Sequence, residues 1–162
     1  MTEILVDSNV LVYAHDLSEP EKQRRALEVL DRLVETALGV LSAQTLAEFY
    51  AVTTRKLPSP LSAEQAYAQI EHFIRIWPIL DVTSQVVLEA ARGARDYRFS
   101  FWDAQLWAAA RLHNVPVVFS EDFNPDSVIE GVRFVNPFAD DFRAEDWGAE
   151  STLTHEAGES SR

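Results

Sequence analysis

The chain has 162 residues, of which 47% are hydrophobic, which suffices for one buried core and predicts a single domain. Its 26 acidic and 14 basic residues give a net charge of -12, and such a surface repels a phosphate backbone unless cations or local basic patches intervene. Cysteine is absent and no apolar run approaches the roughly 18 residues that span a bilayer, which excludes disulfide scaffolds, thiol catalysis and membrane insertion and predicts a cytoplasmic protein.

The first elements are a short strand and a long helix. Residues 3–7 are too few for a helix, and their apolar centre is mostly β-branched, which predicts a buried strand. Ser18 has the character of an N-cap, and Pro20 follows in what would be the first turn. We expect this helix to run to about Leu38 and to end at Gly39.

A second strand and two more helices follow. Residues 40–41 are apolar and short, and Ser42 is a plausible cap for the helix after them. Two prolines within 58–60 interrupt the chain. Ser62 then opens a capping box, which predicts a helix that runs to Ile76.

The second half continues the alternation. Residues 79–80 are a third strand candidate, and 84–96 have an apolar face at helical spacing. The stretch 101–113 is the most apolar helix of the chain, so we expect it to be buried on most sides. Residues 115–119 and 131–135 are the last two predicted strands.

Strands that alternate with helices predict an α/β fold with parallel βαβ units. We expect one domain over residues 1–142. The remaining residues, 143–162, are polar and acidic, and their composition predicts a disordered tail. Parallel sheets bind ligands outside the carboxyl ends of their strands, so polar residues at that edge are the first candidates for a functional site.

Four carboxylates fall near that edge. Asp7 and Asp122 follow predicted strands, and Asp103 lies in the first turn of its helix. Glu48 comes six residues after Ser42, roughly 9 Å along the helix from the same edge. Because gathered like charges repel one another, a fold that concentrates them normally needs a cation, and oxygen ligands suit Mg²⁺.

Each acid also has an ordinary explanation. Asp7 could be a turn residue, and Asp103 could belong to a capping box. Glu48 taken alone resembles a solvated helix residue. A loop acid explains Asp122 equally well, and Glu121 competes for the same role. The case for a site rests on the convergence of four acids from distant parts of the chain.

The motifs resemble those of a known family. They are DSNVLVY at residues 7–13, the helical Glu48, FWDA at 101–104 and FSED at 119–122. In order and spacing of the four acids the chain is similar to the PIN-domain ribonucleases, and within that family to the VapC-type toxins, over residues 1–138.

This resemblance implies a three-layer domain whose central parallel sheet has the order 3-2-1-4-5, with helices on both faces. It implies one or two Mg²⁺ ions, with Mn²⁺ as a substitute, and endonucleolytic cleavage of RNA. The net negative charge weakens non-specific RNA binding and thereby favours a shaped substrate such as a tRNA stem-loop. It also implies a homodimer and a cognate antitoxin that inhibits it. The residues it assigns are Asp7 and Asp103 as principal metal ligands, Glu48 and Asp122 as the rest of the acidic cluster, and Asn9 and Ser120 as supporting polar groups.

Hydrolysis by water activated at a metal needs no side-chain nucleophile and leaves 5′-phosphate and 3′-hydroxyl ends. Two alternatives stay open. A non-catalytic module could use the same acidic pocket to receive a basic segment of an antitoxin, with an arginine in place of the cation. A phosphoryl-accepting receiver domain shares the parallel sheet, but the chain lacks paired acids after the first strand and a lysine near the last one.

Overall fold

The structure, a computed structural model, describes residues 2–149 and confirms the α/β class. Its centre is a six-stranded sheet in the order β3-β2-β1-β4-β6-β5. The five strands from β3 to β6 pair in parallel, and β5 pairs antiparallel with β6. The strands are β1 (Ile4–Val6), β2 (Gly39–Ser42), β3 (Ile79–Leu80), β4 (Val117–Phe119), β5 (Val128–Ile129) and β6 (Val132–Val135).

The expected order 3-2-1-4-5 therefore describes the parallel strands but misses one edge strand. β5 has only two residues, and Val128 is 62% exposed, so no alternation of apolar and polar residues marks it in the sequence. It joins β6 through Glu130 and Gly131, whose φ angles of 47° and 83° lie in the left-handed region. The correction leaves the three-layer class unchanged.

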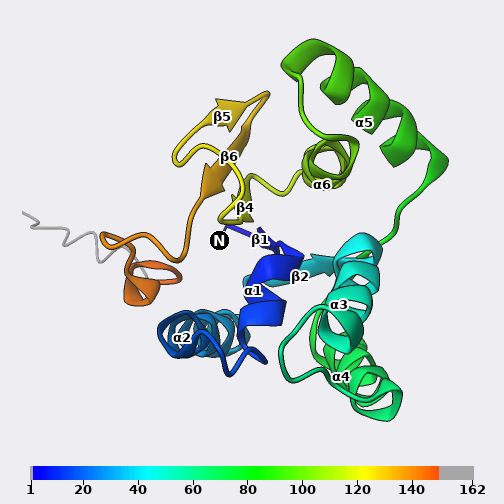
Figure 1. Ribbon diagram of the computed structural model, residues 1–162. Coiled ribbons are helices and arrows are strands. Elements are labelled where there is room, and N and C mark those ends of the chain that lie inside the picture. The colour runs from blue at the N-terminus through cyan, green and yellow to red at the C-terminus, as the bar shows by residue number, and fades with distance from the viewer. Residues whose placement is uncertain (1, 150–162) are drawn as a thin grey trace, which may run out of the picture.

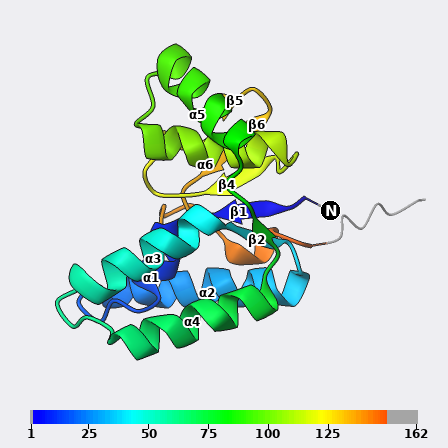
Figure 2. The same cartoon turned by 90° about the vertical axis from the view of Figure 1, so that its right-hand side faces the viewer.

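Helices cover both faces of the sheet (Figures 1 and 2). In Figure 2, α5 and α6 lie above the sheet and α1 to α4 lie below it. No helix in residues 2–149 is long and apolar enough to cross a membrane. The helices are α1 (Ser8–Tyr13), α2 (Pro20–Thr36), α3 (Ala43–Arg55), α4 (Ala63–Ile76), α5 (Ser84–Tyr97) and α6 (Phe101–Leu112).

β1 is the central strand and is buried on both faces. Ile4 and Val6 pack in the core beneath the sheet with α1 to α4, whereas Leu5 packs in the core with α5 and α6. All three side chains are 0% exposed. Successive side chains of a strand point to opposite faces, so a strand between two helix layers must be apolar throughout. Asp7, the next residue, is thereby carried to the middle of the carboxyl edge.

Helix ends agree with the sequence at three points and differ at two. Ser42 caps α3 through its hydroxyl oxygen, and Ser62 forms the expected capping box on α4. Pro20 is the first residue of α2. The prediction that Ser18 is the N-cap of α2 is wrong, because Glu19 occupies that position and makes no side-chain capping hydrogen bond. The prediction that Gly39 ends α2 is wrong, because Ala37 ends it in the left-handed conformation at φ 55°. Gly39 instead opens β2, where a Cβ would lie 1.8 Å from the indole ring of Trp77.

The packed chain continues past the expected boundary at residue 142. Residues Ala144–Asp146 form a 3₁₀ turn, and the Trp147 ring then meets the ring of Phe119 edge to face at 4.8 Å. Arg32 in α2 donates to the Trp147 carbonyl oxygen at 2.8 Å. One buried aromatic contact thus holds a segment whose overall composition predicts disorder. The rest of the predicted tail, residues 150–162, lies outside the described residues.

Candidate active site

One pocket at the carboxyl edge of the sheet brings the four predicted acids together. Its volume is about 740 Å³, and its lining includes Asp7 after β1, Glu48 of α3, Asp103 of α6 and Asp122 after β4. These residues come from four separate parts of the chain, as the parallel topology requires. The pocket is therefore the convergence that the sequence suggested.

Asp7 is the most enclosed of the four acids, with 6% of its surface exposed. Its carboxylate caps the short helix α1 by accepting from the backbone N–H of Ser8 at 2.7 Å, and it accepts from the Ser120 hydroxyl at 2.7 Å. Burial raises the pKa of Asp7 to about 7, and the negative charges of Glu48 and Asp122 add to that rise. The structure thus keeps at the sheet edge a carboxyl group that ionises reluctantly.

Glu48 is held in place by neutral partners. The Ser8 hydroxyl donates to Glu48 Oε2 at 2.6 Å, and the Gln44 amide donates to Glu48 Oε1 at 2.7 Å. Ser8 therefore links the region of Asp7 to Glu48, although 40 residues separate the two partners. A solvated helix residue would have no such fixed contacts, so the ordinary explanation of Glu48 does not describe it.

Two buried amides connect α3 with α6, and the sequence analysis did not single them out. The Gln105 amide donates to Gln44 Oε1 at 2.8 Å, and Gln44 Nε2 donates to the Trp102 carbonyl oxygen at 2.9 Å. Both glutamines are less than 10% exposed. A glutamine inside the most apolar helix was the available signal, because a buried amide needs partners. The pair fixes the spacing of Glu48 and Asp103.

Asp103 occupies the first turn of α6, and the Ser100 hydroxyl caps that turn by accepting from the Asp103 N–H at 3.2 Å. Capping and a place in the pocket therefore coexist. Partial burial raises the pKa of Asp103, and the charges of Asp122 and Glu48 raise it further. Asp103 and Asp7 thus experience the same negative surroundings.

Asp122, not Glu121, faces the pocket. The Asn9 amide donates to Asp122 Oδ2 at 3.2 Å and also lies 3.3 Å from the Ser120 hydroxyl. Glu121 instead pairs with Lys22 at 2.9 Å and accepts from the Tyr13 hydroxyl at 2.5 Å. Glu121 is therefore paired with Lys22 outside the pocket, and Asp122 is the acid that remains available for the site.

The four carboxylates line the pocket but do not converge on a single point. Within residues 2–149, no three His, Asp or Glu side chains come near enough to one another to form a metal-binding group. The donor set nevertheless suits a hard divalent cation, because every candidate ligand is an oxygen and the pocket lining has only Lys56 to balance the acids. A cation among these acids would lower the raised pKa values of Asp7 and Asp103.

The sequence matches the PIN domain over residues 4–129, which is more than half of the chain. The chain belongs to the PIN domain family. Membership confirms the family resemblance found in the motifs and removes the receiver-domain alternative. No curated protein matches the sequence.

Solved PIN-like structures share the fold. A toxin–antitoxin complex from Klebsiella pneumoniae is similar with a TM-score of 0.59 and 17% identity, over 83% of this chain and 98% of that one. DNA-bound VapBC from Salmonella typhimurium is similar with a TM-score of 0.55 and 21% identity, over 83% of this chain and 97% of that one. The sarcin-ricin loop cleaving toxin VapC20 of Mycobacterium tuberculosis is similar with a TM-score of 0.56 and 20% identity, over 81% of this chain and 99% of that one. At these identities the likeness shows a common fold.

Proposed function

We propose that this PIN-domain protein is the toxin of a toxin–antitoxin pair and acts as a Mg²⁺-dependent endoribonuclease, with Mn²⁺ as a possible substitute. The observation that carries the proposal is the single pocket lined by Asp7, Glu48, Asp103 and Asp122. Support also comes from the similar structures, which include a toxin that cleaves the sarcin-ricin loop and several toxin–antitoxin complexes. RNA is abundant in the cytoplasm, where we expect the protein to act.

Asp7 and Asp103 would be the principal metal ligands, and Glu48 and Asp122 would complete the set. When bound, a divalent cation supplies Lewis acidity that stabilises charge on the phosphate and makes water a stronger nucleophile. The chain itself fixes the carboxylates before substrate arrives. Ser8 and Gln44 orient Glu48, and the polar partners of Asp7 and Asp122 are Ser120 and Asn9.

The proposal includes two protein partners. A second copy of the chain would form a homodimer, and a cognate antitoxin would inhibit the toxin. The complexes with antitoxins among the similar structures support the second partner. An arginine or lysine of the antitoxin has a natural place among the acids, because it would neutralise the same charges as a cation.

The second candidate is a non-catalytic PIN-like module whose acidic pocket only receives such a basic segment. The separation of the carboxylates in the described residues favours it, because a guanidinium group needs paired oxygens and not a closed metal-binding group. This alternative and the nuclease predict different results in one assay.

The deciding experiment is cleavage of total cellular RNA by the purified chain with Mg²⁺ or Mn²⁺. EDTA and the Asp103→Asn variant are the negative controls. Asp126→Asn is the matched control, since it removes the same charge from an acid that pairs with Arg133 on the surface. Metal-dependent cuts in the wild type and Asp126→Asn alone support the nuclease. Metal binding without any cleavage would leave the binding module as the better explanation.

A further inference from the structure

Trp102 is a large aromatic residue exposed at the rim of the acidic pocket. Its surface is 62% exposed, whereas Trp77 and Trp107 are 6% and 0% exposed. It lines the pocket and directly precedes Asp103. Single exposed apolar side chains are common on proteins, but an exposed indole that also lines a candidate active site is an apolar surface available to a ligand.

The position of Trp102 is fixed. Its carbonyl oxygen accepts from the buried Gln44 amide at 2.9 Å, and its ring meets the ring of Phe101 edge to face at 5.4 Å. Gln44 also donates to Glu48, so one buried amide holds both Trp102 and Glu48. Asp103, the second acid, directly follows Trp102 in the chain. A flat ligand on this ring would thus have a defined place relative to the acids.

The pocket extends away from the acids along α3. Glu48 and Val52 of α3 and its C-cap residue Lys56 recur at intervals of four residues, so they lie along one ridge that continues to the end of the helix. Ala47 and Ala51 lie beside the ridge, and their small side chains leave room for a ligand. Lys56 lies about 12 Å beyond Glu48 along the helix axis. The groove is therefore lined by acids and an indole, with one lysine at its far end along α3.

Proteins that hold single-stranded nucleic acid combine basic residues that contact phosphates with aromatic rings that stack on bases. In this chain the first component is weak, since the net charge is -12 and Lys56 is the one basic residue among those that line the pocket. Stacking must then supply a larger share of the affinity. Trp102 is the aromatic residue that the pocket lining offers for it.

We propose that Trp102 is a base-stacking platform and Lys56 a phosphate contact for single-stranded RNA that lies along α3. An unpaired base rests on the indole, and the phosphate next to it lies near the acids, where the cation of the proposed function would offset the repulsion. This inference rests on the proposed nuclease function and names the form of its substrate: an unpaired segment, bound chiefly by stacking and with little dependence on salt.

The first test measures binding separately from cleavage. In the Asp7→Asn background, which we expect to leave RNA intact, the protein is titrated with a short unstructured oligouridylate while its tryptophan fluorescence is followed. We expect quenching in Asp7→Asn and none when Trp102→Phe is added, because Trp77 and Trp107 are buried and Trp147 is not among the residues that line the pocket. Trp102→Ala should raise Kd, measured for all variants by the anisotropy of a dye-labelled oligouridylate, about tenfold to a hundredfold, the range of base–aromatic stacking.

Control variants separate stacking from other effects. Trp102→Phe should keep most of the affinity, because phenylalanine still presents a ring. Tyr67→Ala removes another exposed aromatic, 69% exposed on α4 and outside the pocket, and should leave Kd unchanged. Lys56→Ala should reduce the slope of log Kd against log salt by about 0.7, the value of one phosphate contact on a single strand.

Cleavage gives the second readout. If the wild type cuts RNA, Trp102→Ala should raise KM by the same factor and leave kcat nearly unchanged. An unaltered Kd and KM in Trp102→Ala would overturn the platform while leaving the nuclease intact. Loss of dimerisation in place of RNA affinity would assign the indole to a protein interface and also overturn it. Quenching by RNA without cleavage by the wild type would refute the nuclease alone.

Discussion

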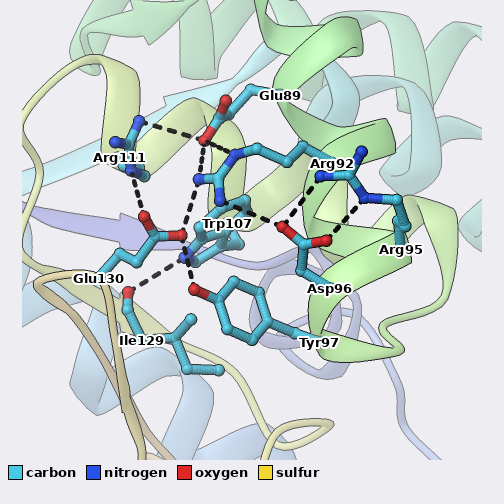
Figure 3. Close-up of polar contacts among 9 residues, drawn as sticks. All are labelled: Glu89, Arg92, Arg95, Asp96, Tyr97, Trp107, Arg111, Ile129 and Glu130. Carbon is cyan, nitrogen blue, oxygen red and sulfur yellow. Dashed lines mark hydrogen bonds and ion pairs between the residues drawn. The ribbon is translucent and has the colours of Figure 1, made fainter.

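Two charged regions of this molecule contrast in how their acids are partnered. At the acidic pocket, Asp7 and Asp103 have neutral hydrogen-bond donors and negative neighbours, and their pKa values are raised. In a second region, among α5, α6 and the β5–β6 turn, Glu89 and Glu130 face arginines, and hydrogen bonds from Arg92 lower the pKa of both. Figure 3 shows this second region, the α5 ion-pair cluster: Glu89, Arg92, Arg95, Asp96, Arg111 and Glu130.

The α5 ion-pair cluster has an evident structural purpose. Arg92 reaches Glu130 at 2.7 Å, and the nearby Trp107 indole donates to the Ile129 carbonyl oxygen at 3.1 Å. These contacts attach the β5–β6 hairpin to α5 and α6 (Figure 3). Every charge there has an opposite charge within the fold, whereas the pocket leaves its charges for something outside it. A candidate functional site is therefore distinguished from a structural ion-pair network by whether its charges have opposite charges within the fold, and not by how many charges it has.

The largest expected effect comes from removing one pocket charge. Asp103→Asn should lower metal-dependent RNA cleavage by roughly a thousandfold or more, because a neutral amide binds a divalent cation poorly. Its fold should persist, as judged by circular dichroism. Glu89→Gln in the α5 ion-pair cluster should keep full cleavage. Equal losses in both variants would erase the contrast between the two regions.

Asp7→Asn should stabilise the metal-free protein at pH 8 by about 1 to 3 kcal/mol, because the buried carboxylate no longer has to ionise. The pKa of Asp7 is about 7 in the fold, against 3.8 for an aspartate in an unfolded chain. Between those values the folded state holds a proton that the unfolded chain has lost, so the free energy of unfolding falls as pH rises toward about 7. Urea unfolding at several pH values measures this.

The difference in the free energy of unfolding between wild type and Asp7→Asn separates the titration of Asp7 from that of the other ionisable groups. It should be near zero below about pH 4 and largest above about pH 7. Saturating Mg²⁺ should stabilise the wild type more than the variant, since only the wild type has the full set of carboxylates. A pH-independent difference would mean that Asp7 ionises normally.

Truncation after Phe142 asks whether the last described segment belongs to the scaffold. Removal of Trp147 uncovers Phe119 of β4 and leaves Arg32 without its carbonyl partner. We expect a loss of about 1 to 3 kcal/mol in thermal or urea unfolding, as for other losses of a large aromatic contact. Truncation after Ala149 is the matched control and should retain the stability. Cleavage by the folded fraction should stay unchanged in both.

The smallest effect is expected in the α5 ion-pair cluster. Glu130→Gln removes one charge from an exposed network and should lower Tm by less than the truncation does, because water and salt screen such pairs. The loss should shrink further in high salt. Cleavage should be unaffected. A large loss of activity would connect this region to the pocket and contradict the division of roles.

The sequence predicts the elements whose causes are local. Caps at Ser42 and Ser62 depend on side chains within one turn, and both are present in the structure. The apolar run of β1 likewise predicts a strand between two layers. From these elements the parallel topology follows, and with it the edge at which Asp7 and Asp122 lie.

The features that the sequence does not predict depend on distant partners. α1 is an exception: it is only six residues long, and its cap is the adjacent Asp7, so a local N-cap signal was available and was not used. Gly39 lies against Trp77, and Trp147 against Phe119, contacts that join segments far apart in the chain. The amide pair of Gln44 and Gln105 also spans 61 residues. Such contacts become visible only once the layers are assembled.

The central position of β1 has a consequence for the timing of synthesis. β1 is made first, but its hydrogen-bonded neighbour β4 and the acid after it are made more than a hundred residues later. At typical translation rates this takes roughly 10 s, during which Asp7 has no Ser120 and no Asp122 beside it. Any activity of this pocket therefore begins all at once, when nearly the whole domain has emerged from the ribosome.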